Sequence, residues 1–515
     1  MHWLFLLCIA SCVLLSANAF SAPTLLWAYK GPCEDWGCST GWYSSPAVAE
    51  LNGERIVVAA TYGVHALFGR NGSTLWSHPQ GDVGGGRTWP DVAIQDVDND
   101  NSLEVITAHG GGTVGVWRLE DGQSFSEDWP LSVIDNELRA LVVADLDRDN
   151  NDNLEIISPS DVHYVCAYEA DGTAITSAYD DIVWGQIPFC TAETLEERRA
   201  GCLCDNPNWP DPTRTNFADG PVSIADLEGD GTEELVFVGR SYAFCGGGGE
   251  RTTHNGLYVI KKDRTRWNTD KYNWSFVPDK HTNPELGDPI SFDYNDLESI
   301  LYNPVLADLD GDNEMEILFS SYDGKMHAFW LDKTQHCNWP YNYNAGRNYL
   351  VGASPPVVAD LDNDGLAEVI FTTWTEKGSY QNGSLYIVSW SGNVLHKLDL
   401  PPSKDPDEDW DGALASPTLA NIDDTPDLEI IILTAHSGAV AYTIPGSADA
   451  RILWQTGRGN FERTGTVLDP PLREGGEPEN DTCPLPDADQ NDEDGGDGGS
   501  FASRLEPSSL SSLYY

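Results

Sequence analysis

The feature that most constrains this chain is a unit that returns along most of its length: an apolar strand ending in Ala-Asp, a short acidic turn and a second apolar strand. The clearest copies are NPVLADLDGDNEMEILFSSYDGKMHAF (303–329) and SPPVVADLDNDGLAEVIFTT (354–373). Alternating residues such as Val305, Ala307 and Leu309 give the first strand one apolar face, and the run after the turn indicates a more deeply buried strand. The chain is therefore built from repeated strands.

Seven copies of the unit occur, the first truncated and the last worn, at 45–67, 90–108, 139–158, 219–239, 303–329, 354–373 and 416–442. Each copy supplies about three strands, and the intervals supply a fourth that often closes on Leu-Trp or Trp-Pro. Seven four-stranded sheets arranged radially form a β-propeller, in which stacked blades protect one another's faces. The 49 Gly, 31 Pro and only 3 Met also favour turns and strands. We predict an all-β fold, a seven-bladed β-propeller of four-stranded blades.

The acidic turn has the donor set of a calcium site. Counted from the first Asp of the copy Asp308–Glu316, carboxylates stand at positions 1, 3, 5 and 9, and position 7 is expected to offer its backbone carbonyl. Calcium takes six to eight oxygen ligands at about 2.3 to 2.6 Å and tolerates irregular geometry. No His or Cys lies in these turns, which disfavours soft metals. The turns therefore predict calcium-binding inter-strand loops.

Four copies keep this spacing, and their predicted ligands are Asp96, Asp98, Asp100 and Glu104; Asp226, Glu228, Asp230 and Glu234; Asp308, Asp310, Asp312 and Glu316; and Asp360, Asp362, Asp364 and Glu368. The third copy is two residues longer, which makes its last ligand ambiguous; its predicted ligands are Asp145, Asp147, Asp149 and Glu155. The seventh begins with Asn421 and is expected to bind weakly through Asp423, Asp427 and Glu429. The first has only Glu50, Asn52 and Glu54 and is predicted to bind nothing.

The alternative for any single turn is a solvated loop, because Asp and Gly are ordinary turn residues. Five near-intact copies at the same point of the same unit argue against that alternative for the set. β-branched residues where helices would lie exclude an EF-hand. Packing three or four carboxylates into one turn without a cation costs Coulomb repulsion, so we predict about five Ca²⁺ sites whose occupation is linked to folding.

With their Ala-Asp-Leu-Asp-Gly-Asp lead, these turns resemble the FG-GAP/VCBS repeats of integrin α-subunit-like β-propellers, over residues 24–466. The resemblance implies about seven blades with calcium in the loop between the first two strands of a blade, and the ligands above are carried over on that spacing. The Phe-Gly and Gly-Ala-Pro signatures of integrin repeats are missing, which places the chain nearer the microbial VCBS group, whose functions are diverse. The stretch from Val64 to Trp76 also looks like quinoprotein-type repeats, without the adjacent Cys-Cys pair of a quinone enzyme.

The two ends of the repeat region are similar: TLLW at Thr24–Trp27 and ILW at Ile452–Trp454. Residues 457–465, GRGNFERTG, also look like a terminal motif of such propellers. We expect the N-terminal strand to complete or abut the last blade. An ordinary eighth edge strand is the alternative.

The N-terminus has the pattern of a signal peptide. An apolar run at 3–17 is followed by Ala17-Asn18-Ala19, which fits the small-x-small rule for cleavage. A lipoprotein box ending at Cys12 is the alternative. We predict a secreted or cell-surface protein with a signal peptide at 1–19.

Nine cysteines remain beyond this segment, and their close spacings suit local disulfide loops in an exported protein. Their odd number leaves one thiol, for which Cys483 is the first candidate. The propeller is predicted at 20–469, followed by an acidic, disordered tail at 470–515 that cannot bury a core.

The charge of the chain limits its partners. With 29 Lys and Arg against 82 Asp and Glu, the formal charge is −53, which argues against nucleic acid and anionic membrane because both need a basic face. No later segment reaches the roughly 20 apolar residues of a transmembrane helix.

Two blades carry insertions of roughly 30 residues, and insertions in repeat folds often form the binding face. The second, at 240–300, combines Trp with scarce positive charge, so we predict ligand contacts at Arg251, Arg264, Arg266, Trp267 and Trp274. The alternative is that these aromatic residues pack their own loops. The predicted function is an adhesion or ligand-binding scaffold for an extracellular protein or glycan; the alternative is a lyase-like, polysaccharide-active enzyme on the same fold.

Overall fold

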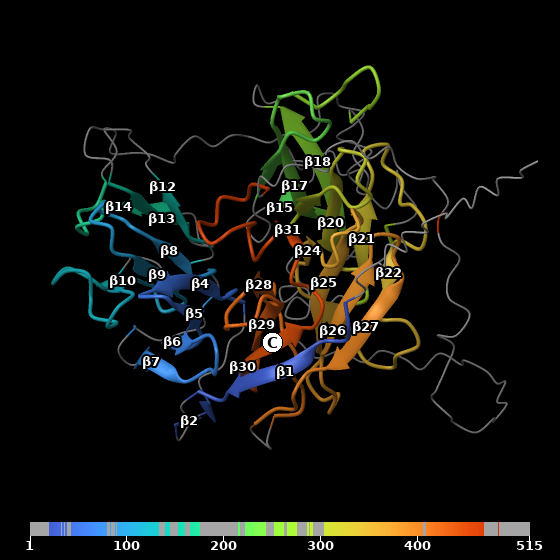
Figure 1. Cartoon of the computed structure of the whole chain (residues 1–515). Coiled ribbons are helices and arrows are strands. Elements are labelled where there is room, and N and C mark those ends of the chain that lie inside the picture. Colours follow the sequence, from blue (N-terminus) through green and yellow to red (C-terminus); the bar gives the residue numbers. More distant parts are fainter. Residues whose placement is uncertain are drawn as a thin grey trace, which may run out of the picture. The chain divides into compact units, whose positions relative to one another are not determined.

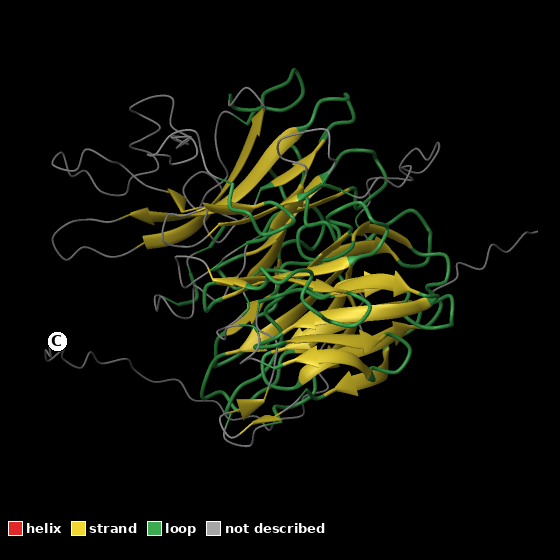
Figure 2. Ribbon diagram, turned by 90° about the vertical axis from the view of Figure 1, so that its left-hand side faces the viewer, coloured by secondary structure: helices red, strands yellow, loops and turns green. Residues whose placement is uncertain are grey.

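The computed structural model describes residues 20–31, 33–34, 37–38, 43–79, 90–132, 140–144, 153–159, 165–175, 215–216, 222–243, 252–261, 265–274, 303–404 and 408–467, with Cys483 and a few single positions between these ranges. They fall in one compact unit that ends at Cys483. Strands and loops make up this part of the chain, and no helix occurs in it (Figure 2). The described residues hold no helix long and apolar enough to cross a membrane.

Seven antiparallel sheets form the blades, and this confirms the predicted seven-bladed, all-β propeller (Figure 1). Blades one and two are β4 (Ala47–Leu51), β5 (Glu54–Ala60), β6 (Val64–Phe68) and β7 (Thr74–His78); and β8 (Ala93–Gln95), β9 (Glu104–His109), β10 (Thr113–Arg118) and β11 (Leu131–Ser132). Blades three and four are β12 (Val142–Ala144), β13 (Glu155–Pro159) and β14 (Val165–Tyr168); and β15 (Thr215–Asn216), β16 (Ser223–Ala225), β17 (Glu234–Ala243) and β18 (Thr252–Lys261).

The remaining three blades complete the ring. Blade five is β19 (Val305–Ala307), β20 (Glu316–Ser320), β21 (Lys325–Phe329) and β22 (Tyr341–Asn342). Blade six is β24 (Val357–Asp360), β25 (Glu368–Thr375), β26 (Ser384–Ser389) and β27 (Val394–Asp399), with β23 (Val351–Ala353) along the end of β25. Blade seven is β28 (Thr418–Ala420), β29 (Leu428–Thr434), β30 (Gly438–Ile444) and β1 (Thr24–Tyr29). A small hairpin, β2 (Cys33–Glu34) and β3 (Gly37–Cys38), pairs Cys33 with Cys38 along the backbone.

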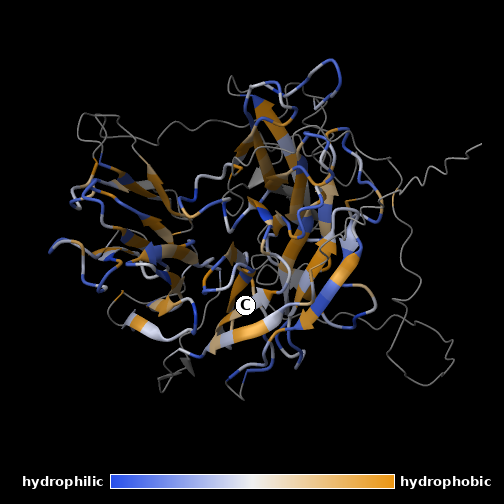
Figure 3. Ribbon diagram, in the orientation of Figure 1, coloured by the Kyte–Doolittle hydropathy of each residue, from blue (hydrophilic) through white to orange (hydrophobic). Residues whose placement is uncertain are grey.

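The ring closes through the N-terminal strand. β1 pairs antiparallel with β30 and is the outer strand of blade seven (Figure 1). The expectation that the N-terminal strand completes the last blade is therefore confirmed. Hydrophobic residues concentrate on the strands and hydrophilic residues on the loops (Figure 3), as expected for blades that bury both faces against their neighbours.

Tryptophan residues of outer strands and their flanks link one blade to the next. In each case the indole N–H donates to a backbone carbonyl of the following blade: Trp27 to Gly69, Trp76 to Leu119 (2.8 Å), Trp129 to Ala170 (2.9 Å), Trp274 to Leu331 (2.9 Å) and Trp339 to Trp390 (2.7 Å). Four of these five tryptophans lie in Leu-Trp or Trp-Pro dipeptides of the sequence: Trp27, Trp76, Trp129 and Trp339. They satisfy a buried donor and fix the blade spacing.

The Leu-Trp at 453–454 behaves differently from the others. It lies in β31 (Arg451–Trp454), which pairs with β24, the innermost strand of blade six, and not at the outside of a blade. The expectation that a Leu-Trp closing marks the fourth strand of a blade is therefore wrong at this position. Outer-strand pairing in blade seven is already supplied by β1, so the returning chain adds to an inner edge instead.

The inner segment, residues 451–467, runs along the inner strands of several blades. The guanidinium of Arg463 is fully buried and donates to the carbonyls of Ser45 and Pro46 in blade one and of Val92 in blade two. Thr466 forms a parallel bridge with Ile224 of blade four. A single C-terminal stretch thus ties together blades that are far apart in sequence.

One cysteine prediction is wrong. Cys483 was the first candidate for the unpaired thiol, but it forms a disulfide with Cys337 of blade five, at a Cα–Cα distance of 5.1 Å and a sequence separation of 146. Spacing alone favoured short loops, whereas the fold brings these two distant positions together.

Candidate metal centres

Each acidic turn closes a hairpin in the same register. The residue before position 1 pairs with the Glu at position 9, as Ala307 does with Glu316 and Ala359 with Glu368. One oxygen of that Glu accepts the backbone N–H of position 2: Val97 to Glu104 (3.1 Å), Leu227 to Glu234 (3.3 Å), Leu309 to Glu316 (2.7 Å), Leu361 to Glu368 (2.8 Å) and Ile422 to Glu429 (2.9 Å). The second carboxylate oxygen of Glu316 and of Glu429 is buried and has no hydrogen-bond partner.

The first Asp organises the rest of the turn. Asp96 accepts the N–H groups of Asp100 (3.1 Å) and Asn101 (2.8 Å), and Asp360 accepts those of Asp364 (3.0 Å) and Gly365 (2.9 Å). Positions 4 and 6 have positive φ in the four regular loops and are always Asn or Gly: Asn99, Asn101, Gly229, Gly231, Gly311, Asn313, Asn363 and Gly365. These are the residues that tolerate the left-handed conformation, so the sequence encodes the backbone path.

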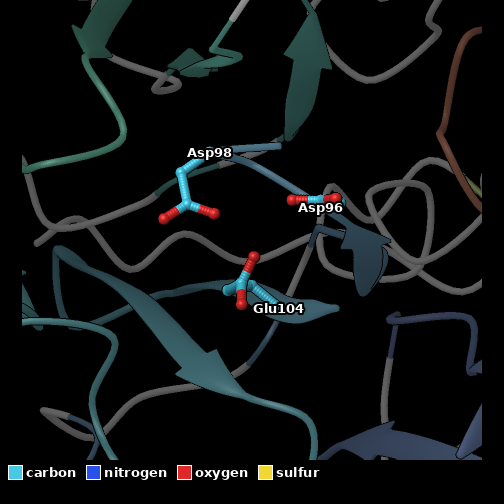
Figure 4. A group of neighbouring side chains, drawn as sticks. All are labelled: Asp96, Asp98 and Glu104. Atoms are coloured by element: carbon cyan, nitrogen blue, oxygen red, sulfur yellow. The ribbon is translucent and has the colours of Figure 1, made fainter. Parts of the chain in front are cut away.

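Three loops gather carboxylates closely enough to share one ion. The groups are Asp96, Asp98 and Glu104; Asp308, Asp310 and Glu316; and Asp360, Asp362 and Asp364, with candidate ligand atoms within 4.8 Å of one another in each group. Figure 4 shows the first group, whose three carboxyl groups surround one space between β8 and β9. The loop at Asp226–Glu234 shares the backbone bonds but does not gather three carboxylates to this distance.

Buried oxygens without partners test whether a cation fits. In the loop of blade five, Asp310 Oδ1 and Glu316 Oε1 are buried and have no hydrogen-bond partner, and in blade six the same holds for Asp362 Oδ1. Leaving such acceptors unpaired costs roughly 1 to 3 kcal/mol each, and more when they are charged. A hard cation would satisfy these oxygens at once, so the residues present fit calcium.

The electrostatics of the loops agree. Burial, with a smaller contribution from the neighbouring carboxylates, raises the pKa of Glu368 to about 9 and the pKa of Glu104 and Glu234 to about 7. The same causes raise the pKa of Glu316 well above its usual value. Without a cation, Glu368 would keep its proton at neutral pH, and Glu104 and Glu234 would be partly protonated there. A divalent ion would take the place of those protons.

Two predicted sites differ from the regular loops. Asp145, Asp147 and Asp149 of blade three lie outside the described residues, while Glu155 is buried opposite Ala144 at the expected register. In blade seven, Pro426 occupies position 6, where the other loops need positive φ, and Asp427 accepts the N–H of Gly446 (3.1 Å). Asp423, Asp427 and Glu429 are not among the gathered groups.

Sequence reasoning missed four residues that contact these loops. The indole of Trp330 donates to Asp310 Oδ2 (3.1 Å), and the guanidinium of Arg451 donates to Asp360 Oδ2 (2.7 Å). Lys271 and Tyr272 of blade four both bond to Glu314, at position 7 of the blade-five loop. No local pattern signals these contacts, because the partners are 20 to 91 residues apart.

The five residues predicted to contact a ligand in the second insertion differ in their exposure to solvent, and two of them lie outside the described residues. Trp267 and Trp274 are buried at 2% and 1% exposure and pack against each other, as the alternative interpretation expected, so these indoles are unavailable to a ligand. Arg266 is partly exposed and bridges to Ile260 along the backbone. Arg251 and Arg264 lie outside the described residues.

Comparisons with known proteins agree with this geometry. Residues 308–371, which span the loops of blades five and six, match the model of the FG-GAP-like repeat. No curated protein matches the chain in sequence.

Similar solved structures include BamB from Moraxella catarrhalis, with 12% identity over 81% of this chain and 85% of that chain and a TM-score of 0.33. BBS1N in complex with ARL6DN has 11% identity over 79% and 94%, with a TM-score of 0.39. The quinohemoprotein alcohol dehydrogenase from Comamonas testosteroni has 12% identity over 85% and 79%, with a TM-score of 0.36. Similarities this low carry no functional conclusion.

Proposed function

The chain is a seven-bladed β-propeller that carries an FG-GAP-like repeat, and we propose that it is an exported, calcium-stabilised scaffold that binds an extracellular protein or glycan. The observation that carries the calcium part is the pair of buried, unpartnered oxygens of Asp310 and Glu316 in the blade-five loop. A calcium ion would be the positively charged partner of these two oxygens, in the loop between β19 and β20.

Several residues would hold the ions. In the two best-formed loops they are Asp308, Asp310, Asp312 and Glu316, and Asp360, Asp362, Asp364 and Glu368. Asp96, Asp98, Asp100 and Glu104, and Asp226, Glu228, Asp230 and Glu234, would hold two more ions, and the blade-three loop a fifth. Because the loops connect the first two strands of each blade, ions bound there would stiffen the ring and leave its outer loops free to bind.

Export is supported by the signal-peptide pattern at 1–19 and by the disulfide between Cys337 and Cys483, since disulfides persist in oxidising compartments. The ligand face is proposed at the blade-four insertion, 240–300, where Arg251, Arg264 and Arg266 offer positive charge on an acidic protein. Such a face would suit an acidic glycan or an acidic protein surface.

Thermal unfolding in EDTA, in Ca²⁺ and in Mg²⁺, with bound metal counted by native mass spectrometry, tests the calcium part. We expect a rise in melting temperature specific to Ca²⁺, because each site held at about 100 times its Kd adds roughly 2.7 kcal/mol. About five bound ions are expected. Equal curves in EDTA and Ca²⁺ with no bound ions would exclude calcium as a structural ligand.

The binding part needs a separate assay. Uronate polymers are the probe, with the double variant Arg264→Ala, Arg266→Ala compared against the unchanged protein in Ca²⁺. We expect binding that the double variant weakens and that salt screens. If the double variant binds uronate polymers as tightly as the unchanged protein, the ligand does not bind at these two arginines.

A further inference from the structure

Successive acidic loops are joined to one another by backbone hydrogen bonds. In three blades the N–H of position 8 donates to the C=O of position 2 in the preceding blade: Leu154 to Val97 (2.9 Å), Met315 to Leu227 (3.0 Å) and Ala367 to Leu309 (2.8 Å). For blade three, Leu154 is the equivalent of position 8 because it precedes Glu155. The loops are therefore neighbours in contact and not independent turns.

These bonds use the residues between the candidate ligands. Position 2 lies between the carboxylates of positions 1 and 3, and its own N–H is held by the Glu of position 9. Position 8 directly precedes that Glu. From blade four to blade six, the path runs without interruption through Glu234, Leu227, Met315, Glu316, Leu309, Ala367 and Glu368.

Packing makes this path stiff. The side chains of Leu227, Leu309 and Leu361 at position 2 are fully buried, and Ala367 is 1% exposed. A buried leucine in a close-packed core cannot reorient without disturbing its neighbours. When Glu316 coordinates an ion, its hydrogen bond to the N–H of Leu309 would fix the position of Leu309. The carbonyl of Leu309 would in turn position the N–H of Ala367, which directly precedes Glu368.

We propose that the loops of blades four, five and six bind calcium cooperatively, each occupied loop ordering the next through the bond between positions 8 and 2. This inference rests on the proposed calcium function and adds its regulation: the three blades would load as one unit. By thermodynamic linkage the coupling acts equally in both directions along the path.

The structure also marks where the coupling ends. In blade seven the N–H of Leu428, at position 8, donates to Ser447 Oγ (2.8 Å) instead of to a carbonyl of the blade-six loop. The backbone path to blade six is absent there, although the two blades are adjacent in the ring. Blade seven thus offers a control for a charge change in a loop that lacks this bond.

Trp330 makes a site-resolved experiment possible. Its indole N–H bonds to Asp310, so Tb³⁺ bound in the blade-five loop should emit on indole excitation, and the difference between the parent and Trp330→Phe isolates that loop from the other indoles. The parent is titrated with Tb³⁺ beside Asp364→Asn, which disables the blade-six loop, and Asp427→Asn, which makes the same charge change in blade seven. Each is paired with its own Trp330→Phe version, and all titrations are run in high salt to screen direct charge effects.

Asp364→Asn should weaken Tb³⁺ binding in the blade-five loop by about 5-fold or more, the lower end of usual coupling between sites. Asp427→Asn should leave it unchanged. A second variant, Ala367→Pro, removes the connecting N–H while keeping every carboxylate, and should abolish the effect of Asp364→Asn.

The outcomes distinguish the proposed cooperativity from the proposed metal sites. Trp330-dependent emission with identical titrations in the parent and Asp364→Asn would overturn the cooperativity and keep the metal sites. No Trp330-dependent emission at any Tb³⁺ concentration would overturn the proposed metal function itself. If Ala367→Pro does not fold, the comparison of Asp364→Asn with Asp427→Asn still shows whether disabling the blade-six loop weakens Tb³⁺ binding in the blade-five loop.

Discussion

Arg451 and Asp360 are register partners across β31 and β24, and the guanidinium of Arg451 lies 2.7 Å from Asp360 Oδ2. Asp360 is fully buried and is also the first candidate ligand of the blade-six loop. β31 thus places the permanent positive charge of Arg451 beside Asp360. Without Arg451, a bound ion would be the only positive charge at this carboxylate. Among the regular loops in the described residues, this is the one whose first carboxylate forms an ion pair with an arginine.

Replacing Arg451 by Met should destabilise the metal-free protein and enlarge its response to calcium. Breaking a buried pair costs about 3 to 5 kcal/mol, and the partial exposure of Arg451 reduces that to roughly 1 to 3 kcal/mol. Calcium would then neutralise Asp360 without competition, so the Ca²⁺-induced rise in melting temperature should grow. Arg55→Met, at the exposed pair with Glu50 in the first copy, is the matched control and should cost less than about 1 kcal/mol. Equal losses in both variants would contradict the role given to Arg451.

Stability in EDTA should fall as pH rises from about 7 to about 9. Burial raises the pKa of Glu368 to about 9, so in this window the folded state holds a proton that the unfolded state has already lost. Folding stability then decreases with pH, because its slope follows the protons bound by the unfolded state minus those bound by the folded state. In saturating Ca²⁺ the loops are already deprotonated and the decrease should vanish. Melting temperatures at pH 7, 8 and 9 in both buffers measure this, and a parallel decrease in Ca²⁺ would count against the loops as its origin.

Gly122→Ala should destabilise more than Gly53→Ala. Both residues have positive φ, +71° and +82°, so both substitutions carry a left-handed penalty of about 1 to 2 kcal/mol. A Cβ at Gly122 would lie 2.6 Å from the indole of Trp76, whereas a Cβ at Gly53 would meet nothing within 4 Å. The clash at the Trp76 contact between blades one and two should add roughly 1 to 3 kcal/mol, measured by denaturant unfolding. Equal losses at the two positions would show that the indole contact adds no constraint.

Removing the disulfide between Cys337 and Cys483 should lower stability by about 2 to 5 kcal/mol, because the bond closes a long loop of the chain. Cys337→Ser, Cys483→Ser and the double variant should show the same loss, since each removes the same bond. Denaturant unfolding and thiol labelling of the single variants measure this. Additive losses in the double variant would mean that the two cysteines act separately.

The repeat architecture could be predicted because its information is local. The unit around Asp308–Glu316 recurs with one spacing, and the alternation of Val305, Ala307 and Leu309 predicts a strand wherever it stands. Closure by β1 could be predicted as well, since an end strand resembling the others needs a partner. The gathering of carboxylates in the loops of blades two, five and six followed the same spacing. That calcium is the ion stays a prediction.

The errors share one physical cause. Trp454 follows a leucine as Trp76 does but pairs at an inner edge, because β1 already occupies the outer edge of blade seven. Trp267 and Trp274 have the composition of a binding face, yet burying their large apolar rings between blades is more favourable than exposing them. The pairing of Cys483 with Cys337 depends on where the folded chain returns.

The sequence by itself determined the repeated strand-turn-strand unit, the number of blades and the positions of the acidic residues in the turns. Periodicity, turn residues and ligand spacing act within about ten residues, a range over which chain connectivity already restricts geometry. Only the tertiary structure decided the contact of Arg451 with Asp360, the bonds that join one loop to the next and the partner of Cys483. These depend on segments as far as 146 residues apart, which come together only when the ring closes.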